Sequence, residues 1–310
     1  MKVLVAGATG LAGSAISKAF KAEGHDVVSV NRTTFDLLNL DATRRYLMST
    51  KPNLVIDAAA KVGGIGANNS KPVEFLSDNL TIQSNLMQAS FQADVEKFVF
   101  LGSSCIYPRD SSQPIKEEYL MTGPLESSNS AYAIAKIAGI EMVNSYRKEF
   151  GLNWISVMPT NLYGPGDNFN LETSHVLPAL IRKFIEAEAA GANSVSIWGT
   201  GSPLREFMHV SDLAKAVIVA AEKYDSSLHL NIGTGQEISI SDLAKKIAEQ
   251  VGFKGEIVWD RSKPDGTPRK VLDVTRIAAL GWEPTITLDI GIASTINWYR
   301  QAVVRREVRL

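Results

Sequence analysis

A tyrosine and a lysine four residues apart, Tyr132 and Lys136, form the first pair in this chain whose side chains could do chemistry together. On a helix, positions i and i+4 lie on one face, so the phenol and the ammonium would be neighbours. The pair follows LGSSCIYP, an apolar run that ends in two hydroxyls and a thiol, Ser103, Ser104 and Cys105. The spacing alone is a weak indicator, but together these groups predict proton transfer at a carbonyl that Ser103 holds.

The segments around these residues alternate short apolar runs with helical patterns. The apolar runs cover residues 3–6, 26–30, 54–58, 97–102 and 154–158. Repeated strand-then-helix units are typical of a parallel sheet wrapped by helices, and runs without polar alternation indicate strands covered on both faces. The sequence therefore predicts an α/β fold with a doubly wound parallel (Rossmann) sheet, whose ligands bind outside the carboxyl ends of the strands.

The character of the chain changes near residue 164, where GPGDNFN is typical of a loop. SHVLPALIRKFIEAEAA is then helical, VSIWGTGSPLREFMHV predicts a strand, a turn and a strand, and ISISDLAKKIAEQVG begins with a Ser/Asp cap. We expect a dinucleotide-binding domain over residues 1–164 and a smaller mixed α/β substrate-binding lobe over residues 165–310, with residues 206–234 returning to the first domain. The ligand cleft should lie between the sheet and the lobe.

A glycine-rich loop, GATGLAG, joins the first apolar run to the first helix. Gly7 permits a tight turn, Gly10 lets the backbone approach a pyrophosphate, and Gly13 allows the helix to pack on the strand. The free N–H groups and the positive dipole of the helix N-terminus would then face the phosphates. Because the glycines follow an initial strand, the loop predicts a dinucleotide site. Its remaining candidate contacts are Thr9, Leu11 and Ala12.

The end of the second strand indicates which dinucleotide is bound. DVVSV is followed by an asparagine and Arg32, where an acidic residue would accept a hydrogen bond from a ribose 2′-hydroxyl. An arginine can pair with a 2′-phosphate, so the sequence favours NADP over NAD. Alternatively, Arg32 is a solvated loop residue, and Asp36 or Asp41 contacts the adenosine.

A nicotinamide at the carboxyl edge of the sheet would lie beside Tyr132 and Lys136. The lysine and an oxidised nicotinamide would both favour tyrosinate. They are therefore expected to lower the pKa of Tyr132 from about 10 toward the working pH.

The composition excludes several classes of function. The 310 residues contain 32 Lys and Arg and 33 Asp and Glu, so a formal net charge of -1 provides no positive field for nucleic acid or an anionic membrane. No apolar run reaches about 18 residues, which predicts no membrane span, and glycines interrupt the apolar start as they would not in a signal peptide. One cysteine cannot form an internal disulfide or a structural zinc site, so we expect no metal and a reducing, cytoplasmic setting.

The glycine loop, together with Ser103, Tyr132 and Lys136, resembles the extended short-chain dehydrogenase/reductase family. Within it, six segments in order along nearly the whole chain closely resemble the GDP-L-fucose synthases: AAAKVGGIGANN, LGSSCIYP, PTNLYGPGDNF, SHVLPALIRKF, WGTGSPLREFMHV and KPDGTPRK. The resemblance implies an enzyme that epimerises GDP-4-keto-6-deoxy-D-mannose at C3 and C5 and then reduces C4 with NADPH.

Inversion at C3 and C5 requires a proton to leave one face of each carbon and return on the other, so two acid/base groups are needed. By resemblance, these are Cys105 and His175, while Ser103 and Tyr132 stabilise the enolate oxygen and Tyr132 gives the final proton at C4. A thiol and an imidazole both titrate near neutrality, and which is base and which is acid stays open. Without the resemblance, Cys105 would be a small buried hydrophobe and His175 a capping or core residue. The remaining histidines are interpreted as structural: His25, His209 and His229.

The resemblance also assigns contacts to the two ligands. The expected substrate contacts, whose cations suit a pyrophosphate and whose indole can cover a ring, are Lys183, Trp198, Arg205, Asp265 and Lys270. Lys183 could equally lie on a solvated helix face, and Asp265 could be a turn residue. The other expected cofactor contacts are Ala59, Leu101, Gly102, Ser104, Pro159, Asn161 and Leu162, besides Lys136 and His175.

One departure from the family affects the cofactor. Many members carry a histidine and an arginine in the glycine loop, where this chain has Ala8 and Thr9, so Arg32 would make more of the contact with a 2′-phosphate. The alternative functions are a GDP-L-colitose synthase, another GDP-sugar 4-reductase or epimerase, and a regulator that senses a dinucleotide on the same fold. Cys105 and His175 argue against a simple reductase.

Two helical segments bear on the oligomeric state. Residues 78–93 and 130–150 carry small and apolar residues on more than one face. In the family, such helices pair across a two-fold axis into a four-helix bundle, which implies a homodimer. Alternatively, both helices simply pack on the sheet.

Overall fold

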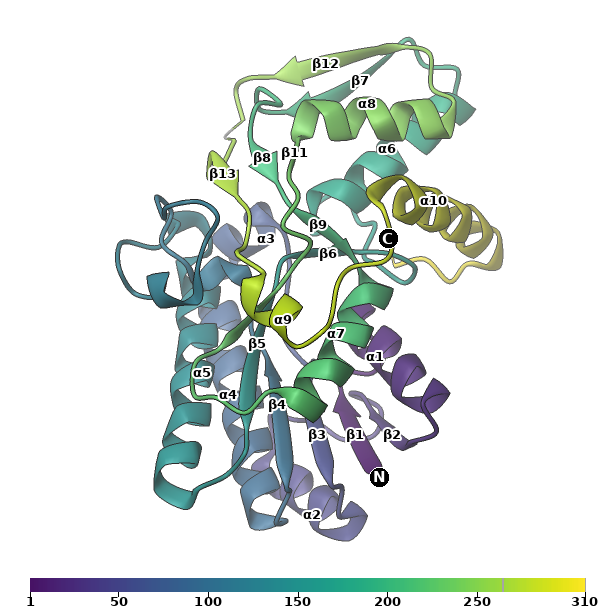
Figure 1. The fold of residues 1–310 in the computed structure, drawn as a ribbon. Coiled ribbons are helices and arrows are strands. Elements are labelled where there is room, and N and C mark those ends of the chain that lie inside the picture. Colours follow the sequence, from purple (N-terminus) through teal and green to yellow (C-terminus); the bar gives the residue numbers. More distant parts are fainter. Residues whose placement is uncertain (264, 310) are drawn as a thin grey trace.

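Six parallel strands form the central sheet of the computed structural model, which describes residues 1–263 and 265–309 (Figure 1). The strands are β1 (Lys2–Ala6), β2 (Asp26–Val30), β3 (Leu54–Asp57), β4 (Lys97–Leu101), β5 (Ile155–Pro159) and β10 (Leu230–Ile232). Their order is β2-β1-β3-β4-β5-β10, which confirms the predicted parallel sheet. The direction of winding changes between β1 and β3, and ligands of such sheets bind in the crevice at that point.

Helices cover both faces of the sheet because its strands are apolar on both sides. The helices are α1 (Leu11–Ala22) and α7 (Val210–Lys223) on one face, and α2 (Leu40–Thr50), α4 (Pro72–Gln92) and α5 (Ser130–Phe150) on the other. Side chains of β1 alternate between the two cores: Val3 packs toward α1 and α7, and Leu4 toward the other three helices. With both faces covered, the strand ends are left to bind ligands.

A smaller lobe stands above the carboxyl ends of the strands (Figure 1). Its strands pair in three groups: β7 (Ser194–Trp198) with β12 (Glu256–Asp260), β6 (Asn161–Tyr163) with β9 (Phe207–His209), and β8 (Leu204–Arg205) with β11 (Ile238–Ser239) and β13 (Arg269–Lys270). Its main helices are α6 (Val176–Ala189), α8 (Ile240–Val251) and α10 (Leu288–Arg305). The short helices are α3 (Ile65–Ser70), α9 (Thr275–Ala279), η1 (Ser104–Ile106), η2 (Glu117–Tyr119) and η3 (Ser127–Asn129).

The segment VSIWGTGSPLREFMHV differs from its predicted strand, turn and strand. It supplies β7, β8 and β9, and each of these strands belongs to a different sheet. The physical reason lies in Gly199 and Gly201, whose φ angles of 82° and 78° turn the chain twice within three residues.

Helix α7 and strand β10 belong to the larger lobe, although β9, just before them in the chain, lies in the smaller one. Helix α7 packs on the sheet beside α1, and β10 pairs in parallel with β5, with Leu230 opposite Val157. The domain boundary expected between residues 164 and 165 stays a prediction.

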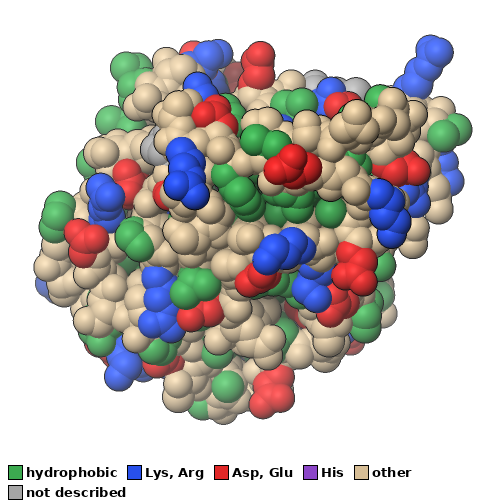
Figure 2. All heavy atoms as spheres, turned by 90° about the horizontal axis from the view of Figure 1, so that it is seen from above, with side chains coloured by type: hydrophobic (Ala, Val, Ile, Leu, Met, Phe, Trp, Pro, Cys, Tyr) green, Lys and Arg blue, Asp and Glu red, His purple; other side chains and the backbone are tan. Residues whose placement is uncertain are grey.

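The surface carries charges of both signs. On the face seen in Figure 2, Lys and Arg side chains are interspersed with Asp and Glu, in keeping with the formal net charge of -1. Within residues 1–263 and 265–309, no helix combines the length and apolar character that crossing a membrane requires.

Asp167, in the loop between β6 and α6, leads to a stability prediction. Its side chain is 5% exposed, its Oδ1 accepts a hydrogen bond from the Asn168 N–H (2.7 Å), and burial raises its pKa to about 7. A carboxyl whose pKa is raised by folding destabilises the fold as pH rises from its unfolded pKa of about 4 to its folded pKa. Asp167→Asn is therefore expected to raise the melting temperature by several degrees at about pH 8, and by less at about pH 5. Thermal unfolding at both pH values tests this, and an equal change at both would contradict it.

Candidate active site

The loop that joins β1 to α1 has the geometry of a phosphate cradle. Gly7 adopts a positive φ of 78°, and a Cβ there would lie 2.6 Å from the Ala58 carbonyl oxygen. A Cβ at Gly13 would lie 2.3 Å from the Gly7 carbonyl oxygen. Gly10 is the N-cap of α1 and provides no side-chain hydrogen bond, so the helix N–H groups can bind an anion. Thr9 precedes this cap, and Leu11 and Ala12 begin the helix. These residues fit a dinucleotide pyrophosphate.

Arg32 lies two residues beyond β2, close to the glycine loop. The Ala8 N–H donates to the Val30 carbonyl oxygen at 3.0 Å and holds this loop against the end of β2. The Arg32 side chain is exposed, as a group that pairs with an external phosphate must be. Asp41, the alternative adenosine contact, lies in the first turn of α2, and its carboxylate pairs with Arg44 at 2.8 Å. Arg32 is therefore the better candidate for a contact with a 2′-phosphate.

Tyr132 and Lys136 lie on the first two turns of α5, and both side chains are buried, with 9% and 3% exposed. The Lys136 Nζ donates to the Leu101 carbonyl oxygen at 2.8 Å, which anchors it at the end of β4. Ser103 follows β4, and its hydroxyl accepts a hydrogen bond from the Cys105 N–H at 3.3 Å. The same hydroxyl lowers the pKa of the Tyr132 phenol. The structure therefore brings Ser103, Tyr132 and Lys136 together at the carboxyl edge of the sheet.

The pKa of Tyr132 differs from the expected direction. Burial raises it above the ordinary value, and the Cys105 and Asp57 charges raise it further. The Ser103 hydroxyl lowers it only in part. Burial likewise lowers the pKa of Lys136 to about 8, against the opposing charge of Asp57. For both residues, the loss of hydration on burial is thus the largest influence on the pKa. A phenol with a raised pKa keeps its proton at neutral pH and can donate it.

Lys270 connects the two expected acid/base groups of the epimerisation. Its Nζ lies 3.6 Å from Sγ of Cys105, on η1. His175, the N-cap of α6, belongs to the other lobe, and burial and the Lys270 charge lower its pKa. The residue itself is exposed to solvent. The Cys105 thiol and the His175 imidazole, from two different elements, are therefore each linked to the ammonium of Lys270.

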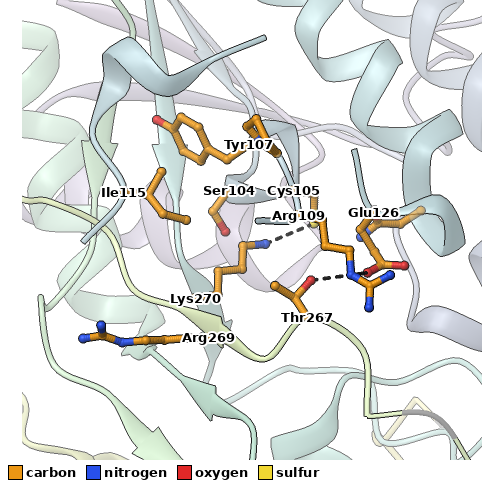
Figure 3. A pocket seen from close by; sticks show the side chains of 11 residues that line it. Ser104, Cys105, Tyr107, Arg109, Ile115, Glu126, Thr267, Arg269 and Lys270 are labelled. Atoms are coloured by element: carbon orange, nitrogen blue, oxygen red, sulfur yellow. Dashed lines mark hydrogen bonds and ion pairs between the residues drawn. The ribbon is translucent and has the colours of Figure 1, made fainter. Parts of the chain in front are cut away.

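A pocket opens beside Cys105 and Lys270 (Figure 3). Glu126 lines it, and its Oε2 lies 3.6 Å from Nε of Arg109 and accepts a hydrogen bond from the Thr267 hydroxyl at 3.5 Å. Sequence reasoning missed these three lining residues. Arg109 directly follows LGSSCIYP and Thr267 lies within KPDGTPRK, so two signals were present, whereas Glu126 belongs to no motif.

The expected substrate contacts fall into two groups. Lys270 lines the pocket, and burial lowers the pKa of Arg205 on β8, against the opposing charges of Asp265 and, to a smaller extent, Glu126. Lys270 is thus placed at the pocket, and the substrate role of Arg205 stays a prediction.

The other three expected substrate contacts engage groups of their own lobe. The Lys183 Nζ donates to a backbone carbonyl oxygen of β7 at 2.9 Å. The Asp265 carboxylate accepts hydrogen bonds from the Thr200 N–H (2.7 Å) and hydroxyl (2.8 Å). Trp198 is 55% exposed, and the Lys263 Nζ lies 5.6 Å from its ring centre. Substrate roles for Lys183, Trp198 and Asp265 stay predictions.

The other expected cofactor contacts lie at or just after the carboxyl ends of β3, β4 and β5. They are Ala59, Leu101, Gly102, Ser104, Pro159, Asn161 and Leu162. The side-chain amide of Asn161 donates to the Glu206 carbonyl oxygen at 2.7 Å, and so joins β6 to the segment before β9. A Cβ on Gly102 would lie 2.3 Å from the end of the Met158 side chain, which would have to move to accommodate it.

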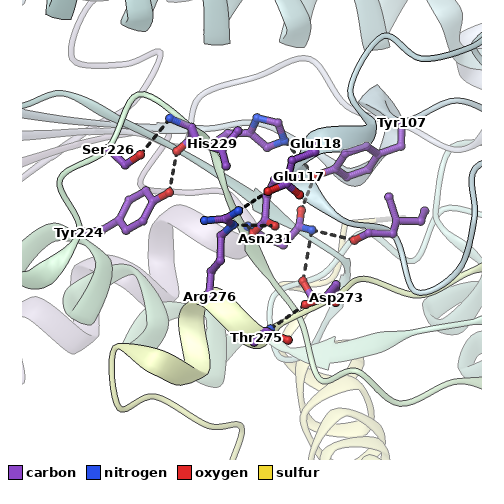
Figure 4. A network of polar contacts seen from close by, with 12 residues as sticks. Tyr107, Glu117, Glu118, Tyr224, Ser226, His229, Asn231, Asp273, Thr275 and Arg276 are labelled. Carbon is purple, nitrogen blue, oxygen red and sulfur yellow. Dashed lines mark hydrogen bonds and ion pairs between the residues drawn. The ribbon is translucent and has the colours of Figure 1, made fainter.

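A network of polar contacts holds Tyr107, one of the residues that line the pocket, in place (Figure 4). The Tyr107 hydroxyl donates to Oδ1 of Asn231 and lies 2.9 Å from Nε2 of His229. The Asn231 N–H donates to Glu117 at 3.1 Å, and Glu117 pairs with Arg276 at 3.2 Å. Burial lowers the pKa of His229 to about 4, so this ring stays neutral. The network holds the segment after η1 against β10 and α9.

Asp57, the last residue of β3, is a buried group that sequence reasoning also missed. Its side chain is 0% exposed, and its Oδ1 accepts a hydrogen bond from the Ala59 N–H at 3.1 Å. Burial raises its pKa to about 6, and the Lys136 charge opposes this in part. The signal was a carboxylate within the otherwise apolar NLVIDAAA.

Comparison with known proteins identifies the family of this chain. The sequence model of the NAD dependent epimerase/dehydratase family matches residues 3–233. GDP-L-fucose synthase of Escherichia coli is 50% identical over 309 residues, which cover 96% of this chain and 96% of that protein. GDP-L-colitose synthase of Yersinia pseudotuberculosis is 37% identical and covers 96% of this chain and 98% of that protein.

The fold is shared with a solved relative. The crystal structure of a GDP-L-fucose synthetase from Naegleria fowleri bound to NADP has a TM-score of 0.91 and 31% identity, covering 100% of this chain and 95% of that chain. The chain therefore belongs to the NAD-dependent epimerase/dehydratase family, in the group of the GDP-L-fucose synthases.

Proposed function

We propose that this protein epimerises C3 and C5 of GDP-4-keto-6-deoxy-D-mannose and reduces C4 with NADPH, giving GDP-L-fucose. The observation that carries the proposal is the Cys105, Lys270 and His175 group beside Tyr132. A simple reductase needs a proton donor such as Tyr132, whereas epimerisation needs a second acid/base set. The higher identity to a fucose synthase than to a colitose synthase supports this substrate.

In the epimerisation, the C4 ketone makes the protons on C3 and C5 acidic. Cys105 and His175 then remove these protons and return them on opposite faces. The Lys270 ammonium, 3.6 Å from the sulfur, can pair with Cys105 once it is charged. The lowered pKa of His175 keeps the imidazole neutral and able to accept a proton at neutral pH. The hydroxyls of Ser103 and Tyr132 donate hydrogen bonds to the enolate oxygen.

In the reduction, NADPH supplies a hydride to C4 when it is bound. Tyr132 donates its proton to the C4 oxygen, and the Lys136 ammonium stabilises the tyrosinate that is left. The glycine loop and the N-terminus of α1 hold the pyrophosphate, and Arg32 pairs with the 2′-phosphate. Arg205 and Lys270 bind the phosphates of the GDP-sugar.

Arg32→Ala tests the cofactor assignment. It is expected to raise the KM for NADPH about tenfold and to leave that for NADH within about twofold, because only NADPH carries a 2′-phosphate. Steady-state kinetics with each cofactor measure both values. Arg44→Ala on the neighbouring helix α2 is the matched control and should change neither. Equal effects of Arg32→Ala on the two cofactors would remove Arg32 from the site.

We also propose a cytoplasmic homodimer. The free Cys105 supports a reducing compartment, and exposed apolar residues on α4 and α5, Val73 (74%) and Ile134 (48%), support pairing of these helices. Sedimentation of the wild type and of Ile134→Glu tests this. A wild-type monomer, or a variant that stays dimeric, would exclude α5 from the interface.

Product identification tests the proposed activity. The wild type is offered GDP-4-keto-6-deoxymannose with NADPH, and NMR of the product sugar is expected to give GDP-L-fucose. A GDP-6-deoxyhexose with unchanged C3 and C5 would assign a simple reductase. Turnover of the corresponding 3,6-dideoxy sugar alone would assign a colitose synthase.

A further inference from the structure

The carboxylate of Asp57 and the side chain of Lys136 lie on the same side of the central sheet. The parallel register sets Asp57 beside Ala6 of β1 and Phe100 of β4. Residues in register on parallel strands project to the same face, so Asp57 points, like Phe100, toward α5. On that face, the Lys136 Nζ lies 4.7 Å from the Phe100 ring centre. The side chain of Asp57 is therefore directed to the layer that contains Lys136.

Both charged groups have hydrogen-bonding capacity that the chain does not use. An ammonium has three donors, and in the described part of the chain the Lys136 Nζ has one acceptor, the Leu101 carbonyl oxygen. Across the same described residues, Oδ2 of Asp57 has no hydrogen-bond partner. A buried carboxylate is costly unless an opposite charge compensates it. Lys136 is the cation that acts on Asp57.

The surroundings of Asp57 isolate this pair from other charges. The titratable groups that it acts on, Lys136 and Tyr132, both belong to α5. Its neighbours on β1 and β4, Ala6 and Phe100, carry no charge. The charge of Asp57 therefore influences mainly the pKa values of Lys136 and Tyr132.

We propose that Asp57 is a positioning residue for the reduction, whose carboxylate keeps Lys136 protonated so that an ammonium is present when Tyr132 gives up its proton. This inference rests on the proposed function and adds a residue to its mechanism. A buried tyrosinate without a counter-charge would be strongly destabilised, so the reduction needs the ammonium. The lowering of the Lys136 pKa to about 8 by burial, which Asp57 opposes, supports this role.

Asp57 also acts directly on Tyr132, in the opposite sense. Its charge raises the pKa of the phenol and so weakens it as an acid. The direct effect is present whenever Asp57 is ionised, whereas the protection of Lys136 matters only as pH approaches the lysine pKa. Removing the charge should therefore cost more activity as the pH rises.

The pH dependence of kcat for the 4-reduction tests the proposal. Asp57→Asn retains an acceptor for the Ala59 N–H and removes the charge. From about pH 6.5 to about pH 9.5, the ratio of wild-type to variant kcat is expected to rise about tenfold. The reason is that the basic limb of the kcat–pH profile moves to lower pH by about one unit. Asp167→Asn, which also removes a buried carboxylate with an unpartnered oxygen, is the matched control and should leave the limb in place. If the basic limb of the profile stays at the wild-type pH in Asp57→Asn, the proposal is overturned.

A second readout does not need the sugar substrate. The affinity for NADPH, measured by its fluorescence, should weaken above the pKa of Lys136, and Asp57→Asn should move that onset to lower pH by about one unit. This separates the two hypotheses: if the wild type binds NADPH but does not convert the GDP-sugar, the proposed function fails while Asp57 is still tested. Should Asp57→Asn not fold, Asp57→Leu removes the same buried charge with apolar volume and must give the same shift. An onset that stays at the wild-type pH in the folded variant would contradict the role.

Discussion

Replacing Tyr132 with phenylalanine is expected to lower kcat for reduction by a factor of about 10² to 10⁴, while the Kd for NADPH stays within about twofold. The change removes the group that we propose as the proton donor and as one hydrogen-bond donor to the developing oxyanion. The ring itself packs edge-on against Phe75, with centroids 6.4 Å apart, and phenylalanine keeps that contact. Initial rates with the 4-keto sugar, together with a fluorescence titration of NADPH, measure the two quantities.

A tyrosine elsewhere on the same helix provides the matched control. Tyr146 packs against Phe91 and Trp154 and has no role in the site, so Tyr146→Phe should turn over like the wild type. If Tyr132→Phe keeps more than half of the wild-type rate, Tyr132 is not the acid.

The second large effect is expected in the exchange of the C3 and C5 protons of the sugar with solvent. In deuterium oxide, the wild type is expected to place deuterium on both carbons, and Cys105→Ser and His175→Ala should each lower that incorporation about 10² fold or more. A hydroxyl is a far poorer base than a thiolate, and alanine carries no proton acceptor at all. Mass spectrometry and NMR of the sugar measure the incorporation.

The same two variants separate epimerisation from reduction. Both retain Ser103, Tyr132 and Lys136, so each should still reduce the unepimerised ketone slowly, to a 6-deoxyhexose with unchanged C3 and C5. His25→Ala, which alters a ring that packs on Phe20 at the surface, serves as the control for histidine loss. Wild-type deuterium at both carbons in the Cys105 and His175 variants would return this protein to the simple reductases.

The central sheet could be predicted because its strands need only local information. The run VLVA is apolar on both sides and is followed at once by the glycines of the first loop, and the parallel sheet follows from repetition of that unit. The second lobe was harder to predict: β8 and β9 are two and three residues long, and strands so short have no readable alternation.

The site was predictable where a motif marks it and unpredictable where the chain must fold to assemble it. Tyr132 and Lys136 are neighbours on one helix, so their spacing was visible. The contact between Cys105 and Lys270 joins positions 165 residues apart, and the link between Glu126 and Thr267 joins positions 141 apart. The raised pKa of Tyr132 was also out of reach, because it depends on how completely α5 buries the phenol against the sheet.

The position of α7 and β10 in the larger lobe, after strands of the smaller lobe in the chain, has a consequence for biosynthesis. A nascent chain that has left the ribosome as far as β5 contains five of the six strands, but the helix that covers much of one sheet face, α7, has yet to be made. Valines and leucines of that face stay partly exposed to solvent while the first segments of the smaller lobe are synthesised. Completion of the larger lobe is thus a late event, and a truncated product that ends between the lobes would expose an apolar sheet surface open to aggregation.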